Sequence, residues 1–320
     1  MNKSRFYKNK KILVCGGGGF IGSHLSRMLS DSEGIVTIVG KSQNNKNPEL
    51  KNIRYISANL FDLNQCRKII SEQDYVFNLT GVVGGLDFNI KNEKKLFLEN
   101  SLLNLNLLLA LSNSNVQRYQ FVSSVAVYPK DSSNPLREEN EITLQNNIFD
   151  YGVAKRLGEL QCESFAREFS LKISVIRADN TYGPNDNFRS TSRVIPSLIK
   201  KTFSENKTIE VWGSGNQIRT FVFVEDLVNG LMLGLEKYSY AEPINISSDK
   251  PIRIRELIDM ILKISNKKNE IKFNLEKPEG NPERCLDFSR AKNLLGYNPK
   301  WNLKRGLEKT IEWYRDNILK

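Results

Sequence analysis

Residues 11–22 of the sequence, KILVCGGGGFIG, decide the fold class. Lys11–Cys15 has the apolar composition of a buried strand, and a helical pattern continues from the glycines to Leu29. Glycine is needed where a backbone turns tightly and approaches a pyrophosphate, and the following helix N-terminus offers free N–H groups to an anion. The glycine spacing is one residue longer than GxGxxG. We therefore predict a dinucleotide-binding turn at Gly16, Gly19 and Gly22.

Short apolar runs and helical patterns alternate through the first half of the chain, which is typical of a parallel sheet covered on both faces. Further strands are expected at 35–39, 52–57, 75–79, 119–123 and 171–176, and helices at 96–111, 151–169, 255–266 and 303–318. After Gly183 the alternation weakens and prolines become frequent. The predicted fold class is α/β, with a doubly wound parallel sheet and a smaller C-terminal α/β domain at its carboxyl edge. The expected domains are 1–180 with 217–248 returning to it, and 181–216 with 249–320.

Composition excludes several classes of protein. The chain has 320 residues, 39% of them hydrophobic and 26% charged, which is typical of globular domains and not of disorder. It has one histidine, His24, and four cysteines far apart, which argues against a metal site and a disulfide scaffold. No apolar run is long enough to span a membrane, and the N-terminus lacks a signal-peptide pattern, so we expect a cytoplasmic protein.

Positive charge is in excess, with 47 Lys and Arg against 36 Asp and Glu, or a net charge of +11. Such a balance favours anionic partners. The charges are spread along the chain and are not interleaved with aromatic residues, so we interpret them mainly as solvated surface and expect no nucleic-acid partner.

The end of the second predicted strand bears on the choice of dinucleotide. An acidic residue is expected there to hold the adenosine ribose, but Val39 is followed by Gly40, Lys41 and Ser42. Lys41 suits the 2′-phosphate of NADP, whereas Ser42 or Gln43 can hold the ribose of NAD. The sequence leaves NAD and NADP open, and we expect weak discrimination between them.

A serine, a tyrosine and a lysine form the candidate catalytic set. Tyr151 and Lys155 are four residues apart on a predicted helix, so their side chains share a face. A neighbouring ammonium stabilises a phenolate, and we expect Lys155 to lower the pKa of Tyr151 so that it can exchange a proton with a sugar hydroxyl. Ser123 and Ser124 close the fifth strand at the carboxyl edge, where ligands bind in such sheets.

In combination these motifs resemble the extended short-chain dehydrogenases/reductases of the nucleotide-sugar epimerase/dehydratase type, which have a Rossmann sheet. The resemblance rests on the glycine turn, SSVAVY (123–128), YGVAK (151–155), RADNTYGPNDNF (177–188) and VWGSGNQIRTFVFVEDL (211–227). Within that family, FNLTGVVGG (77–85), RVIPSLI (193–199) and KPEGNPERC (277–285) are similar to GDP-mannose 3,5-epimerase and GDP-L-fucose synthase. The resemblance implies a tightly bound NAD or NADP and a nucleotide-sugar substrate used for surface polysaccharide precursors.

The resemblance also implies which residues form the site. Ser124, Tyr151 and Lys155 take the catalytic positions, and Tyr151 and Lys155 contact the cofactor as well. Asn100 matches a cofactor-contacting asparagine, but its place at the opening of the predicted helix fits a helix cap equally. The remaining implied contacts are Phe20, Ile21, Asn59, Leu60, Leu79, Thr80 and Gly81 for the cofactor, and Gly85, Ser124, Val125, Asn180, Arg193, Val194, Val211, Trp212, Arg219 and Arg284 for the substrate.

Two departures from the family pattern narrow the expected reaction. The two GDP-sugar enzymes have a cysteine at the position of Ala126 and a histidine or lysine at that of Arg193, as acid and base for epimerisation. Alanine has no proton to exchange, and arginine stays protonated. We therefore expect redox chemistry at sugar C4, as a 4-dehydrogenase, 4-reductase or 4-epimerase, with a GDP-linked hexose or heptose favoured.

Two alternatives remain open. One is 3,5-epimerisation with the acid or base role moved to a residue such as Cys162 or Asp186. The other is a non-catalytic member that binds a nucleotide or RNA. We also expect a homodimer through the helices at 100–112 and 151–169, because apolar residues surround the first of them. His24 is interpreted as a packing residue.

Overall fold

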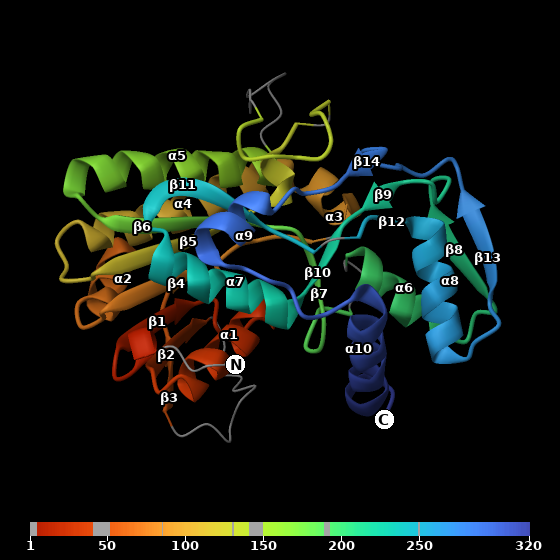
Figure 1. Cartoon of the computed structure of the whole chain (residues 1–320), viewed down its shortest axis with the longest axis horizontal. Helices are drawn as coiled ribbons and strands as arrows, with labels where there is room; N and C mark the ends of the chain where they lie inside the picture. The colour runs from red at the N-terminus through yellow and green to blue at the C-terminus, as the bar shows by residue number, and fades with distance from the viewer. Residues whose placement is uncertain are drawn as a thin grey trace.

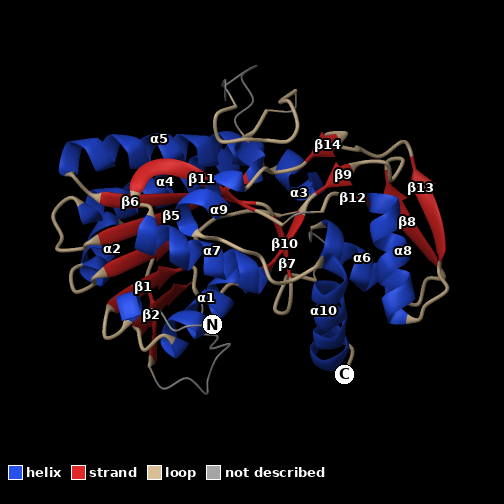
Figure 2. Ribbon diagram, in the orientation of Figure 1, coloured by secondary structure: helices blue, strands red, loops and turns tan. Residues whose placement is uncertain are grey.

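A central sheet of seven parallel strands organises the first part of the chain (Figures 1 and 2). The computed structural model describes residues 5–40, 52–84, 86–129, 131–140, 150–188, 193–248 and 250–320. The strand order is β11, β6, β5, β4, β1, β2, β3. Their bounds are β1 Lys11–Cys15, β2 Ile35–Gly40, β3 Ile53–Ser57, β4 Tyr75–Asn78, β5 Arg118–Ser124, β6 Lys172–Ala178 and β11 Tyr240–Ile246.

Helices cover both faces of this sheet, and alternate strand residues separate the two cores. Leu13 and Cys15 of β1 pack with α2, α4 and α5, whereas Ile12 and Val14 of the same strand pack with α1 and α7. The bounds are α1 Phe20–Asp31, α2 Leu63–Ile70, α3 Leu86–Lys91, α4 Glu93–Leu111, α5 Tyr151–Phe169, α7 Val224–Lys237 and α9 Ser289–Leu295.

A smaller α/β part lies beyond the carboxyl edge of the sheet (Figure 1). It holds the parallel pair β8 and β13 and the three-stranded set β12, β9 and β14, while β7 and β10 form a pair at the junction. Its elements are β7 Asn180–Tyr182, α6 Val194–Thr202, β8 Thr208–Trp212, β9 Ile218–Arg219, β10 Phe221–Phe223, β12 Ile252–Arg253, α8 Ile254–Ser265, β13 Glu270–Asn274, β14 Glu283–Arg284 and α10 Leu303–Ile318.

The predicted fold class is confirmed. Each predicted strand is present, with ends that differ by no more than two residues. The predicted helix at 96–111 begins earlier, at Glu93. The helices α2, α3, α6, α7 and α9 and the strands that follow β6 were not predicted. No helix among the described residues combines the length and apolarity that a membrane span requires.

Candidate functional site

The glycine turn between β1 and α1 has the shape that a pyrophosphate requires. Gly16 has a φ of +81°, and a Cβ there would lie 3.0 Å from the carbonyl oxygen of Leu79. A Cβ on Gly22 would lie 2.3 Å from the Gly16 oxygen, so the helix must begin close to the turn. Gly19 is the N-cap of α1 and has no side chain to satisfy the first N–H groups of the helix. The turn therefore fits a dinucleotide, because the first N–H groups of a helix can donate to the pyrophosphate.

Several predicted cofactor residues meet next to this turn. Leu79 contacts Gly16 closely, and the Nζ of Lys155 donates a hydrogen bond to the carbonyl oxygen of Thr80 at 3.3 Å. A Cβ on Gly81 would lie 3.8 Å from the same Nζ. Farther along the sheet edge, Asn59 is exposed, and the Leu60 carbonyl accepts a hydrogen bond from Asn106. The predicted contacts Lys41, Ser42 and Gly85, with the alternative Gln43, lie outside the described residues.

Asn100 does not have the helix-cap role that the sequence left open for it. It lies inside α4, which begins at Glu93, so it is not a helix cap. Its side-chain oxygen accepts from Val82 N at 2.9 Å, and its nitrogen donates to Val82 O at 3.0 Å and Leu96 O at 2.7 Å. Asn100 therefore holds the strand-end segment that follows Gly81.

Ser124, Tyr151 and Lys155 come together at the carboxyl end of β5. Asp150 caps α5 through a 3.0 Å bond from Val153 N, so that Tyr151 is the first residue of the helix. Ser124 ends β5, its hydroxyl accepts a hydrogen bond from Ala126 N at 3.2 Å, and it lies close enough to the Tyr151 phenol to lower the pKa of that phenol. Lys155 is 4% exposed and donates to Val122 O at 2.8 Å, with its Nζ 5.8 Å from the centre of the Tyr151 ring.

The expected lowering of the Tyr151 pKa by Lys155 is wrong. Burial raises the pKa of Tyr151 to about 12, although Arg193 and the Ser124 hydroxyl act in the opposite direction. Burial also lowers the pKa of Lys155 to about 8, against the opposing influence of Cys162 and Glu159. The phenol is therefore protonated at neutral pH, and most of the lysine is charged.

Two arginines form the positive part of the candidate substrate site. Arg219 on β9 is paired in register with Arg284 on β14, so their like charges lie side by side. Burial and Arg284 lower the pKa of Arg219 to about 10, and burial lowers the pKa of Arg284. The Nε of Arg284 is buried without a hydrogen-bond partner among the described residues. Such a pair fits the oxygens of a diphosphate.

Asp179 is a charged neighbour of these arginines that sequence reasoning missed. Burial raises the pKa of its carboxyl to about 6, against hydrogen bonds from Ser247, Thr220 and Asn180. It favours the charged forms of Arg219 and Arg284. The signal in the sequence is a single acidic residue that follows an apolar strand at the carboxyl edge of the sheet.

Asn180 follows Asp179 and begins β7. Its side-chain nitrogen donates to Thr220 O and to the Asp179 carboxylate, both at 3.0 Å. The side-chain oxygen of Asn180 is therefore the group of this amide that is left for a ligand donor.

Four more predicted substrate residues lie on or beside two elements, α6 and β8. Arg193 precedes α6, pairs with Asp186 at 2.6 Å and lies over the Phe20 ring, while Val194 is exposed. Trp212 ends β8 next to the buried Val211, and Lys277 lies over its ring at 5.6 Å.

Val125 and His24 are packed rather than exposed to a ligand. Val125 is buried in a small cluster with Tyr128 and Leu286. The Nε2 of His24 lies 2.9 Å from the carbonyl oxygen of Pro184. Burial lowers the pKa of His24, which fits its interpretation as a packing residue.

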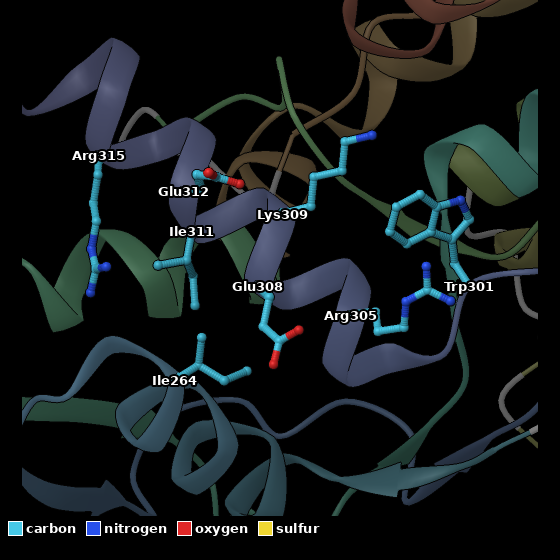
Figure 3. A pocket seen from close by; sticks show the side chains of 8 residues that line it. All are labelled: Ile264, Trp301, Arg305, Glu308, Lys309, Ile311, Glu312 and Arg315. Atoms are coloured by element: carbon cyan, nitrogen blue, oxygen red, sulfur yellow. The ribbon is translucent and has the colours of Figure 1, made fainter.

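Two cavities lie away from Ser124, Tyr151 and Lys155. Figure 3 shows the first, of about 640 Å³, where Glu308, Ile311 and Arg315 of α10 point toward the side of Ile264 of α8 and Arg305 lies beside Trp301. The second, of about 870 Å³, lies between the C-terminal half of α5 and β11. Neither is lined by the residues predicted to bind the cofactor. Among the described residues, no group of His, Cys, Asp and Glu is arranged to hold a metal ion.

Comparisons with known proteins agree with this geometry. The family model "NAD dependent epimerase/dehydratase family" matches residues 12–247. The chain is 28% identical to GDP-mannose 3,5-epimerase of Arabidopsis thaliana, over 98% of this chain and 84% of that one. It is 30% identical to a dTDP-4-dehydro-6-deoxy-D-allose reductase of Streptomyces sp, over 97% of both chains.

Solved structures give the same result. The structure of UDP-glucose 4-epimerase from Thermotoga maritima with UDP-glucose superposes with a TM-score of 0.87 and 26% identity. The match covers 96% of this chain and 99% of that one. The chain therefore belongs to the NAD-dependent epimerase/dehydratase family and is an NAD(P)-dependent sugar-nucleotide enzyme.

Proposed function

We propose that the chain is an NAD(P)-dependent oxidoreductase acting at C4 of a nucleotide-activated sugar, with a GDP-linked hexose or heptose as the favoured substrate. The observation that carries this proposal is the convergence of Ser124, Tyr151 and Lys155 at the carboxyl end of β5, next to the glycine turn. A 4-dehydrogenase, a 4-reductase and a 4-epimerase all use this arrangement. GDP is favoured by the motif resemblance, whereas the relatives above include enzymes named for GDP, dTDP and UDP sugars.

In the proposed reaction, Tyr151 transfers the proton at the C4 oxygen. NAD(P), when bound, accepts or returns the C4 hydride. In reduction, Tyr151 Oη donates its proton to the forming C4 alkoxide, and a pKa of about 12 keeps that proton available at neutral pH. In oxidation only the phenolate form of the same oxygen can take the hydroxyl proton from the sugar, and a pKa of about 12 makes that form scarce at neutral pH. The Ser124 hydroxyl orients the C4 oxygen, and the charged Lys155 stabilises the phenolate.

A nucleotide-sugar screen tests the proposal directly. Mass spectrometry of cofactor released from the purified protein identifies NAD or NADP. GDP-, UDP- and dTDP-linked hexoses and heptoses are then incubated with the protein and assayed for 4-keto products or C4 inversion. Tyr151→Phe is the matched control, since it keeps the ring and removes the proton. The absence of C4 chemistry with all of these sugars would overturn the proposal.

Deuterium incorporation distinguishes C4 redox chemistry from 3,5-epimerisation. Inversion at C3 or C5 needs a separate acid and base, each within about 3 Å of the proton it handles. Ala126 has no titratable group, and the alternative Cys162 is fully buried in the core beneath α5. In deuterated water we expect no enzyme-dependent deuterium at C3 or C5, after correction for solvent exchange of any 4-keto product. Rapid incorporation at either carbon, measured by mass spectrometry, would point instead to a role for Asp186.

The arginine pair gives a prediction for substrate affinity. Arg219→Met or Arg284→Met removes a charge-assisted hydrogen bond to phosphate, worth about 1.5–3 kcal/mol, so KM for the nucleotide sugar should rise roughly 10–100-fold. The dissociation constant of the dinucleotide should stay the same in titration calorimetry. Arg253→Met is the control, because Arg253 is half-exposed on the adjacent strand β12. An unchanged KM in both variants would remove these arginines from the site.

The exposed faces of α4 and α5 support a homodimer. The two helices pack side by side, and Leu98, Leu102 and Leu109 of α4 are 64%, 42% and 36% exposed at helical spacing. Leu160 and Phe169 extend this apolar surface on α5. We expect light scattering to give a dimer at micromolar concentration, and Leu98→Glu with Leu102→Glu to give a monomer. Leu294→Glu on α9, also an exposed leucine, should remain a dimer; a monomeric wild type would contradict the prediction.

A further inference from the structure

A buried ion pair joins α5 to β6 behind the candidate catalytic set. Arg177 and Glu159 are 1% and 2% exposed. The guanidinium binds the carboxylate in two places, Nε to Oε1 at 2.9 Å and Nη2 to Oε2 at 2.8 Å. Buried pairs of this kind rarely add stability beyond what apolar residues of similar size provide. The position of the ion pair in the molecule therefore says more about its role than its contribution to stability does.

The pair holds both ends of the segment that carries Ser124. The hydroxyl of Ser123, directly before Ser124, donates to Glu159 Oε1 at 2.6 Å. On the other side, Arg177 Nη1 donates to the Tyr128 hydroxyl at 2.9 Å, and Tyr128 directly follows the 3-10 turn Val125–Val127. Tyr128 is fixed in turn by its 2.8 Å bond to Asn245 of β11.

The same pair belongs to the helix that carries the other two members of the set. Glu159 lies four residues after Lys155 and eight after Tyr151, so the three side chains share one face of α5. Two glycines bring that face close to β5. A Cβ on Gly152 would lie 2.2 Å from the Ala126 oxygen, and one on Gly158 would lie 2.4 Å from the Phe121 ring.

We propose that Glu159 and Arg177 are positioning residues, which hold the Ser124 segment at a fixed separation from Tyr151 and Lys155. The proposal rests on the proposed C4 reaction, because it assigns these residues to the geometry of that step. They reach the substrate only through Ser124, Tyr151 and Lys155. A displacement of about 1 Å between reacting groups can cost about 10²-fold in rate. Glu159 also favours the charged form of Lys155, which burial opposes.

The test replaces the pair without leaving a buried charge unpaired. Glu159→Leu combined with Arg177→Met removes the whole ion pair and its bonds to Ser123 and Tyr128, which we call the clamp. Either change alone would leave an uncompensated buried charge and endanger folding. Arg156, which also contacts Glu159, has a side chain that is 25% exposed and can turn toward solvent. Arg167→Gln is the matched control, since it breaks the exposed Arg167–Glu163 pair on the same helix.

Two measurements separate positioning from plain stability. Amide hydrogen exchange of residues 124–128, measured without substrate below the unfolding temperature, should rise about tenfold in the double variant. Turnover should fall about 10²-fold while KM for the nucleotide sugar stays near the wild-type value. Arg167→Gln should change neither quantity.

The outcomes are distinguishable. Unchanged exchange in residues 124–128 would overturn the clamp, and raised exchange with unchanged turnover would overturn its role in the reaction. If the wild-type protein turns over none of the nucleotide sugars, the proposed function fails. The exchange measurement needs no substrate and still decides whether the pair holds the Ser124 segment.

Discussion

Replacing Tyr151 with phenylalanine is expected to reduce turnover by about 10²–10⁴-fold, the usual contribution of general acid–base catalysis. The variant keeps the ring that begins α5 and removes only the hydroxyl that lies near Ser124. Because burial holds the pKa of this phenol at about 12, its proton is present at neutral pH and available for donation. The measurement is single-turnover reduction of a 4-keto nucleotide sugar, which isolates the chemical step.

Cofactor and substrate affinity provide the control for this variant. Tyr151→Phe should bind the dinucleotide and the nucleotide sugar almost as the wild type does. Full activity of the variant would remove Tyr151 from the mechanism. A protein that only binds nucleotides or RNA would also tolerate the change, and its affinity would then fall steeply with salt.

Gly19→Val is expected to weaken dinucleotide binding by at least about 100-fold, since its side chain would occupy the space in front of the α1 N-terminus. Gly19 has a φ of −78°, which other residues also adopt. A Cβ added to Gly19 would lie 3.2 Å from its nearest neighbour, the carbonyl oxygen of Gly16. The chain therefore accommodates the substitution with a small shift. Loss of a favourable N-cap should cost only about 1 kcal/mol of stability. Calorimetric titration with NAD and NADP, together with thermal unfolding without cofactor, measures both effects.

Gly22→Ala gives the contrasting result. Its Cβ would lie 2.3 Å from Gly16 O and 2.6 Å from Gly17 Cα, and both are backbone atoms that cannot move independently. This variant should lose stability as well as binding. If Gly19→Val binds either dinucleotide with wild-type affinity, the turn is not where the pyrophosphate lies.

Local sequence signals were sufficient to predict most strands of the central sheet. The strand–glycine–helix unit at 11–31 and the helix that begins at Tyr151 follow from apolar periodicity and from a residue type that the turn requires. The helices α2, α3, α6 and α9 were missed because they have only six to nine residues, which gives too few turns for a periodic pattern. The helix α7 was missed as well, although its 14 residues are enough for such a pattern. The start of α4 was placed too late, since Glu93 and the two lysines after it are polar.

Side-chain environments were harder to predict than secondary structure. The spacing of Tyr151 and Lys155 correctly placed both on one helix face, but only the packed structure shows that burial raises the pKa of Tyr151 and lowers that of Lys155. The roles predicted for Asn100 rested on its position in the chain alone. Its hydrogen bonds to Val82, 18 residues earlier, depend on how two separate segments pack. The Glu159–Arg177 pair joins residues of separate elements, so no local pattern indicates it.

The late arrival of β11 has a consequence for synthesis on the ribosome. Its partner β6 ends at Ala178, and the chain then builds β7, α6, β8 and α7 before Tyr240–Ile246 closes that side of the sheet. Until then, β6 is an edge strand with a free row of backbone donors and acceptors, the kind of surface that pairs with other extended chains. The growing polypeptide is therefore most exposed to misassembly at β6 while its second part is being translated. Pairing with β11, which is itself the edge strand of the finished sheet, ends that interval for β6.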